Sequence, residues 1–144
     1  MRRTIPSRLR RDERGQAIIE FALVVGFLVI LLVSILEMSL FLYTYATLTD
    51  AAKEGVRYAV VHGSSATSQS EPGSTQSVVN AVQTYTAVSL HTIPNTDVQV
   101  NYLDDNNSPG SRVQVSINYP FQPLFLVNWA SVTISATSVG RIQF

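Results

Sequence analysis

The chain has 144 residues, enough for one domain and an anchor, because domains usually contain about 100–150 residues. Charged residues make up only 14% of it and hydrophobic residues 46%. An average soluble protein has about 25% charged residues, so the deficit indicates a membrane segment. There is no cysteine, which excludes disulfides, thiol nucleophiles and thiolate metal sites.

The formal net charge is zero, but the charges are divided unevenly along the chain. Residues 1–14 contain six arginines against two acids, which gives this segment a charge of +4. The remainder has one lysine and three arginines against eight acids, which gives −4. A basic end followed by an acidic body is typical of a chain that a membrane divides.

Residues 21–36, FALVVGFLVILLVSIL, form an uncharged apolar run between Glu20 and Glu37. These two acids are seventeen positions apart, or roughly 26 Å along a helix, which is close to the hydrocarbon thickness of a bilayer. We therefore predict one transmembrane helix, and the preceding arginines predict a cytoplasmic N-terminus and an outer C-terminal domain.

Two other interpretations of the apolar run fit the sequence less well. A buried core helix is disfavoured because so small a domain could not enclose it. A cleavable secretory signal shares the basic start, but the run is longer than a signal's apolar region and no A-x-A site follows it.

The junction at residues 15–21, GQAIIEF, resembles the cleavage site of class III prepilin-like signals: a glycine, four mostly apolar residues and then Glu-Phe. The resemblance implies that a prepilin peptidase cuts between Gly15 and Gln16 and leaves the apolar helix on the mature chain. Glu20 would then dock, together with Phe21, by pairing with the freed amine at Gln16 of an adjacent subunit. An ordinary acid at the membrane interface is the simpler alternative for Glu20.

Residues 15–63 resemble the TadE-like family through GQA-x-x-EFA at the start and AAKEGVRYA near the end. These proteins are minor pseudopilins of the bacterial tight-adherence (Tad or Flp) pilus. The resemblance implies a role in pilus assembly or cell adhesion, with other pilin or pseudopilin subunits as partners. Many relatives have a cysteine pair. Because this chain has no cysteine, their disulfide cannot be carried over to it.

The helix is expected to continue beyond the membrane as a stalk through residues 50–62 and to end at Gly63. An aromatic interface belt would fall at Phe41, Tyr43 and Tyr45. The stalk carries Asp50–Lys53 and Glu54–Arg57 as i,i+3 pairs, which a solvated helix face explains.

The family match instead suggests a helix contact between subunits, for which close packing at Gly55 and Ala59 would leave room. The residues that we assign to this helix contact are Gly55, Arg57 and Tyr58.

The outer part of the chain is expected to contain a polar loop at residues 63–76, a second helix at 77–90 and three strands. The alternating segments predict a small antiparallel sheet, and DDNNSPG at residues 104–110 predicts the hairpin between its first two strands. The fold class is therefore α+β, with a long N-terminal transmembrane and stalk helix. The helix stripe should contain Val78, Val82, Tyr85 and Ser89. The inward strand positions should be Val98, Val100, Tyr102, Val113, Val115, Ile117, Tyr119, Val132, Ile134 and Ala136.

The apolar segment 121–129, FQPLFLVNW, is unusual for a connector, and Pro120 and Pro123 argue against a regular strand there. It either packs on the stalk helix or forms an exposed patch that meets another subunit or the membrane. Replacing Trp129 would separate these alternatives.

No catalytic, cofactor or metal site is predicted. The acidic turn at residues 104–107 lacks calcium-loop spacing, His62 and His91 are isolated from other ligands, and no hydrolase, zinc-protease, P-loop or dinucleotide motif is present. We therefore expect no enzyme activity, no cofactor and no nucleic-acid partner.

The sequence thus predicts a leader at 1–15, a transmembrane and stalk helix at 16–62 and an extracytoplasmic domain at 63–144. The expected location is the bacterial cytoplasmic (inner) membrane, crossed once, with incorporation into an extracellular pilus. The membrane, a prepilin peptidase and other pilus subunits are the expected partners. The alternatives are an uncleaved anchored binding or scaffold module, an anchored enzyme and a secretion-system pseudopilin.

Overall fold

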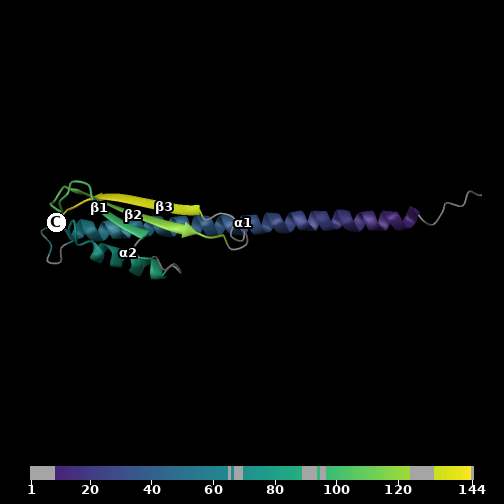
Figure 1. The fold of residues 1–144 in the computed structure, drawn as a ribbon, viewed down its shortest axis with the longest axis horizontal. Helices are drawn as coiled ribbons and strands as arrows, with labels where there is room; N and C mark the ends of the chain where they lie inside the picture. Colours follow the sequence, from purple (N-terminus) through teal and green to yellow (C-terminus); the bar gives the residue numbers. More distant parts are fainter. Residues whose placement is uncertain are drawn as a thin grey trace, which may run out of the picture. The chain divides into compact units, whose positions relative to one another are not determined.

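The structure, a computed structural model, contains two helices and a three-stranded antiparallel sheet (Figure 1). It describes residues 9–64, 66, 70–88, 94, 97–123 and 132–143, with the backbone alone for 9–14. The predicted α+β class with a long first helix is confirmed. The elements are α1 (Leu9–Val61), α2 (Gln76–Val88), β1 (Val98–Tyr102), β2 (Arg112–Phe121) and β3 (Val132–Arg141).

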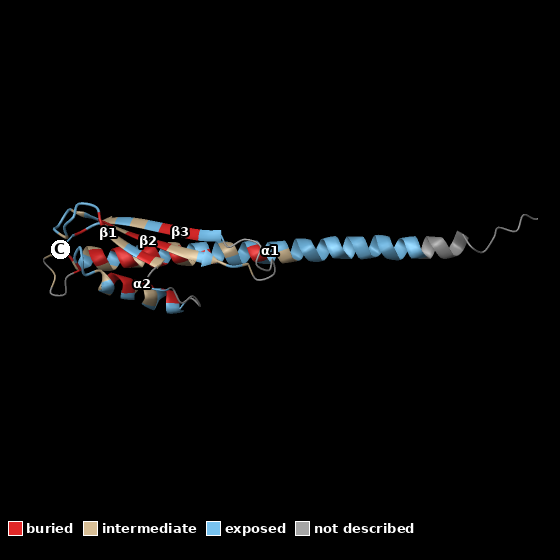
Figure 2. Ribbon diagram, viewed as in Figure 1, coloured by how far each residue is buried: buried red, intermediate tan, exposed pale blue. Residues whose placement is uncertain are grey.

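The chain forms two compact units, Met1–Ser39 and Leu40–Phe144, and the division falls inside α1. In the first unit, every residue from 15 to 32 is exposed (Figure 2). The second unit contains the C-terminal half of α1 together with α2 and the sheet. The stalk half of the helix is therefore part of the folded domain.

Within the second unit, α1 buries a stripe of mostly small side chains. The stripe follows the i, i+3, i+4 spacing of one helix face. Alanine and glycine in it bring other backbones close, because they add little bulk between them. The buried residues of the stripe are Leu48, Ala51, Ala52, Gly55, Val56 and Ala59.

The sheet has the order β1-β2-β3, and its pairing is antiparallel throughout. Side chains alternate along β2, so that Val113, Val115 and Ile117 are fully buried on the face covered by the helices. The opposite face carries polar side chains, as expected for an antiparallel sheet covered on one side. The predicted inward positions of β1 and β2 lie on the covered face.

Two glycines mark where α1 comes closest to its neighbours. A Cβ added at Gly55 would lie 2.6 Å from Val82 Cγ2 of α2 and 3.2 Å from Val115 Cγ1 of β2. A Cβ at Gly140 of β3 would meet Val56 and would lie 2.9 Å from Val60 Cγ2. The absence of a side chain at both positions therefore sets the spacing between α1, α2 and the sheet.

The C-terminal end of α1 is closed by segments distant in sequence. The last carbonyls of a helix have no partner within it and must be satisfied elsewhere. The Gln143 amide donates to the Val60 carbonyl at 3.1 Å, and the Ser70 amide donates to the His62 carbonyl at 2.7 Å. The helix ends at Val61, and the His62 amide still donates to the Tyr58 carbonyl at 3.1 Å.

The predicted hairpin between β1 and β2 is present, and its acidic residues serve the turn. Asp105 has a positive φ of 53°, which aspartate tolerates better than most residues. Asp104 Oδ1 accepts from Arg112 Nη2 at 2.8 Å, while Oδ2 accepts from the Arg112 amide at 2.8 Å and Nε at 3.2 Å. Side-chain and backbone hydrogen bonds from Arg112 lower the pKa of Asp104 to about 2.

Three expectations about the outer elements were wrong. Tyr85 is 39% exposed, because the buried stripe of α2 is Val78, Val79, Val82 and Thr86. Val132, at the first position of β3, is 48% exposed.

The third concerns Pro120, which lies within β2 and pairs with Thr133 of β3. The missing N–H is tolerated because the β1 ladder ends at Ile117, so that of the described strands only β3 lies beside β2 at this point.

The apolar segment 121–129 begins with the last residue of β2, and this residue contacts α1. Phe121 meets Phe41 of α1 edge to face, with ring centroids 5.5 Å apart. Phe41 therefore packs inside the domain, whereas Tyr43 and Tyr45 are about half exposed. Several predicted features lie outside the described residues: the leader at 1–8, Ser89, His91 and Trp129.

A first prediction concerns the close approach at Gly140. Gly140→Ala should lower the free energy of unfolding of the outer domain by about 1–3 kcal/mol, because the new methyl overpacks the contact with α1. Hydrogen exchange of β2 amides in the full chain in detergent measures this. Val56→Ala should make room, so the double variant should lose less than the sum of the two single variants.

Gly26→Ala is the matched control, because a Cβ at Gly26 meets nothing within 4 Å. Additive losses in the Gly140 and Val56 pair would contradict the proposed contact.

A second prediction concerns the Asp104–Arg112 pair. The pKa of Asp104 is lower in the folded chain than the ordinary 3.8. The pair should therefore stabilise the fold above about pH 4, and this stabilisation should be lost as the pH falls to about 2. Carboxyl NMR titration should give a midpoint near 2 for Asp104. Arg112→Gln should raise it toward 3.8, while Arg141→Gln should change it much less. A wild-type midpoint near 3.8 would contradict the bidentate pair.

Candidate functional site

The proposed processing residues lie on the exposed first part of α1. Gly15, Gln16, Glu20 and Phe21 are all in helical conformation and all exposed, with Phe21 at 69%. The helix begins at Leu9, so the Gly15–Gln16 bond lies inside it. A Cβ at Gly15 would meet nothing within 4 Å. The described part of the chain therefore needs no glycine at position 15 for its own packing.

The apolar segment that follows is exposed on all sides. Within residues 15–61, α1 is long and apolar enough to cross a membrane, and none of its most apolar 18-residue window is buried. The described chain therefore does not enclose it, which excludes the buried core helix. So large an apolar surface must be covered by lipid or by other apolar helices.

The structure separates the three residues predicted for a helix contact. Gly55 is enclosed by α2 and β2 of the same chain, and Ala59, one helical turn further on, is fully buried. Tyr58 is partly buried, and its ring stacks on His62 with centroids 3.9 Å apart. Arg57 is exposed, and its Nη1 lies 3.6 Å from Glu54 Oε2. Of the three, only Arg57 is fully exposed on the helix surface.

The charge pairs of the stalk are solvated, as expected. Lys53 Nζ lies 2.9 Å from Asp50 Oδ1, with both side chains more than half exposed. Such pairs contribute little to stability in water, a few tenths of a kcal/mol at most for i,i+3 neighbours. They keep the outer face of α1 polar and electrically neutral.

A buried polar cluster lies where α1 ends, and the sequence analysis missed it. Ser70 is fully buried; its hydroxyl donates to the His62 carbonyl at 3.1 Å and accepts from the Tyr102 hydroxyl at 2.9 Å. Asn107 Nδ2 donates to the Ser70 carbonyl at 3.2 Å. Burial raises the pKa of the Tyr102 phenol, and its hydrogen bond to Ser70 opposes the rise.

This cluster joins the end of the stalk to the β1–β2 hairpin. Its serine lacks the exposed position and the adjacent base that a nucleophile needs. Among the described residues, no group of three histidine, aspartate or glutamate side chains is arranged to hold a metal ion. The arrangement is therefore structural.

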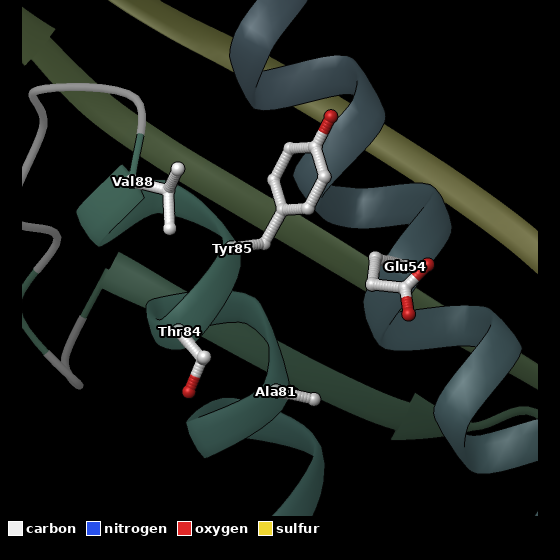
Figure 3. A pocket seen from close by; sticks show the side chains of 5 residues that line it. All are labelled: Glu54, Ala81, Thr84, Tyr85 and Val88. Atoms are coloured by element: carbon white, nitrogen blue, oxygen red, sulfur yellow. The ribbon is translucent and has the colours of Figure 1, made fainter.

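A shallow groove of about 440 Å³ lies between α1 and α2 (Figure 3). Glu54 forms one side of it, and Tyr85 and Val88 of α2 the other, with Ala81 and Thr84 below. One carboxylate among mainly apolar side chains offers no pair of catalytic groups. Sequence reasoning could not find this groove, because its walls come from helices separated by a loop.

Comparison with known proteins gives one family. The model of the TadE-like protein family matches residues 15–57, from the glycine of the proposed cleavage site to Arg57. No curated protein and no solved structure matches the chain. The matched segment contains the exposed apolar half of α1 and the first part of its buried stripe.

The match covers the two motifs that carried the resemblance, except the last two residues of the second motif, Tyr58 and Ala59. This associates the chain with the tight-adherence pilus, whose TadE-like proteins have a structural rather than an enzymatic role. The resemblance is confirmed: residues 15–57 of this chain match the TadE-like protein family.

Proposed function

We propose that this chain is a minor pseudopilin of a tight-adherence pilus, made as a precursor and cut by a prepilin peptidase between Gly15 and Gln16. The observation that carries the proposal is the GQAIIEF junction at the head of an exposed apolar helix, inside the segment that matches the TadE-like family. The chain would cross the cytoplasmic membrane once, with its N-terminus inside and the sheet outside.

The exposed helix suits a protein that packs rather than catalyses. All residues from 15 to 32 are exposed, so each side of this half of α1 is available to lipid in the membrane and to other helices in an assembly. The move between the two requires no rearrangement of a core. The outer domain would then prime, cap or modify the assembly through its own surface.

Cleavage would also change the electrostatics of the helix start. Removal of residues 1–15 deletes the six arginines of this segment and the first turns of α1, which begins at Leu9. The new amine at Gln16 would add a positive charge to the positive end of the helix dipole, which is unfavourable. A carboxylate from Glu20 of a neighbouring subunit would offset that charge and fix the axial position of the two helices.

The first test follows the mass of the chain extracted from membranes of its native host. The wild-type chain should begin at Gln16, and Gly15→Ala should remain uncut and begin at Met1. Because the added methyl meets nothing within 4 Å, loss of cutting cannot be attributed to misfolding. Gly26→Ala, equally free of contacts, should be processed as wild type.

Normal processing of Gly15→Ala would sink the proposal. A wild-type chain that keeps Met1 would instead favour an uncleaved anchored binding or scaffold module. A chain that begins after the apolar segment would identify a secretory signal.

The second test separates docking from cleavage. Glu20→Gln keeps the size of the side chain and removes its charge. The variant should still be cut between Gly15 and Gln16, but its amount in sheared pili should fall about tenfold. A tenfold fall corresponds to the loss of an interaction of roughly 1.4 kcal/mol. Immunoblots of the pilus and membrane fractions measure this. Glu54→Gln, which removes a partly exposed charge from the second half of α1, is the matched control. Wild-type levels of Glu20→Gln in the pilus fraction would contradict the docking role.

A further inference from the structure

The two edges of the sheet differ in how well they are protected. An edge strand exposes unpaired backbone groups, and proteins commonly blunt such edges with short strands, charges, proline or bulges. β1 is only five residues long, whereas β3 has ten. The β2–β3 register runs without interruption from Phe121↔Val132 to Arg112↔Arg141, so no bulge disturbs β3.

β3 also lacks the other protective features. Its residues 132–140 include no charge and no proline. Thr133, Ser135 and Thr137 are exposed, and Val139 is 53% exposed. Among the described residues, no strand pairs with the second edge of β3. Within the described part of the chain, β3 thus presents a ten-residue edge without a bulge, and its one charge is Arg141 at the end (Figure 1).

The charge at the end of β3 indicates what would pair there. Arg141 lies directly opposite Arg112 in the sheet, and like charges in this position destabilise an antiparallel pair. The charge of Arg112 is balanced by Asp104, whose Oδ1 lies 2.8 Å from Arg112 Nη2. In the described part of the chain Arg141 makes no ion pair of its own, although its side chain is exposed. An acidic residue on an added strand could lie opposite Arg141 and balance its charge.

The composition of the strands argues against a second copy of this chain as the partner. β1, β2 and β3 contain no aspartate or glutamate, so none of them can place a carboxylate beside Arg141.

A strand of another protein can carry such an acid. Antiparallel pairing is slightly more stable per residue than parallel pairing, and it is the pairing that β3 already makes with β2.

We propose that the free edge of β3 receives an antiparallel strand from another protein, with an acidic residue near the start of that strand facing Arg141. The added strand extends the sheet to four strands. Its side chains alternate between the polar face, beside Ser135 and Thr137, and the face covered by the helices.

The test uses the full, uncleaved chain in detergent and a peptide as the added strand. β2 already pairs with β3 in an antiparallel register, so the probe is a ten-residue peptide with the sequence of β2 and Glu in place of Arg at its first position. Hydrogen exchange should show new protection at alternate amides of β3. A version of the peptide with Gln at the first position should bind more weakly to the wild-type chain, and Arg141→Gln should remove that difference.

Two lysine variants form a matched pair for the edge. Gln99, Ser116 and Thr137 lie in one row on the polar face, with Gln99 on β1 and Thr137 on β3. Thr137→Lys should weaken peptide binding by about tenfold, because a lysine on an edge strand opposes the pairing of a further strand. Gln99→Lys adds the same charge to the same row at the other edge and should leave the affinity unchanged.

Equal weakening by both lysine variants, or new protection at β1 instead of β3, would overturn the proposal. So would protection of β3 in the absence of peptide together with a dimer by light scattering, because the occupant would then be a second copy. Since the uncleaved chain is used, this result is independent of the processing test. If the chain is cut normally but does not bind the peptide, the proposed strand partner is contradicted and the proposed processing is not.

Discussion

The structure depends on the close approach of α1 to the sheet and to α2. One helix has to suit two environments: its first half is apolar on every side, and its second half must pack into a folded domain. Small residues make the second role possible, since Ala51, Ala52, Gly55 and Ala59 bring the helix close to its neighbours. Gly140 provides the matching space on β3. The polar cluster around Ser70 then joins the helix end to the hairpin.

The sequence predicted those features of the fold that depend on repeated local patterns. Alternation identified the buried positions Val113, Val115 and Ile117, and turn chemistry identified the hairpin. Tyr85 was misassigned because two overlapping stripes of α2 are both apolar, and only the packing partner decides which one is buried. Pro120 was misread because its tolerance depends on where the β1 ladder ends. Gly140 carried a usable signal, a glycine inside a strand pattern, which often marks a close backbone approach.

The proposed processing site was predictable for a different reason. Gly15 lies within a helix, where glycine costs about 1 kcal/mol relative to alanine, and no contact of the described chain requires it. Gly26 has the same property. Packing within the described chain therefore accounts for neither glycine, and at Gly15 the proposed cleavage supplies a reason that the fold does not. The groove beside Glu54 and the Ser70 cluster left no such local signal, because each forms only when distant segments meet.

A membrane anchor also restricts how copies of such a chain can associate. Anchored copies share one direction, so a two-fold axis can relate them only if it lies along the membrane normal. Contacts between different surfaces of neighbouring copies remain possible, and if the rotation does not close they produce an open filament. The exposed first half of α1 suits such contacts, because it presents apolar surface in every direction. The second half cannot serve in the same way, because its close-packing face is already filled by α2 and the sheet. α1 is therefore divided into a first half whose apolar surface is exposed in every direction and a second half that supports the folded domain.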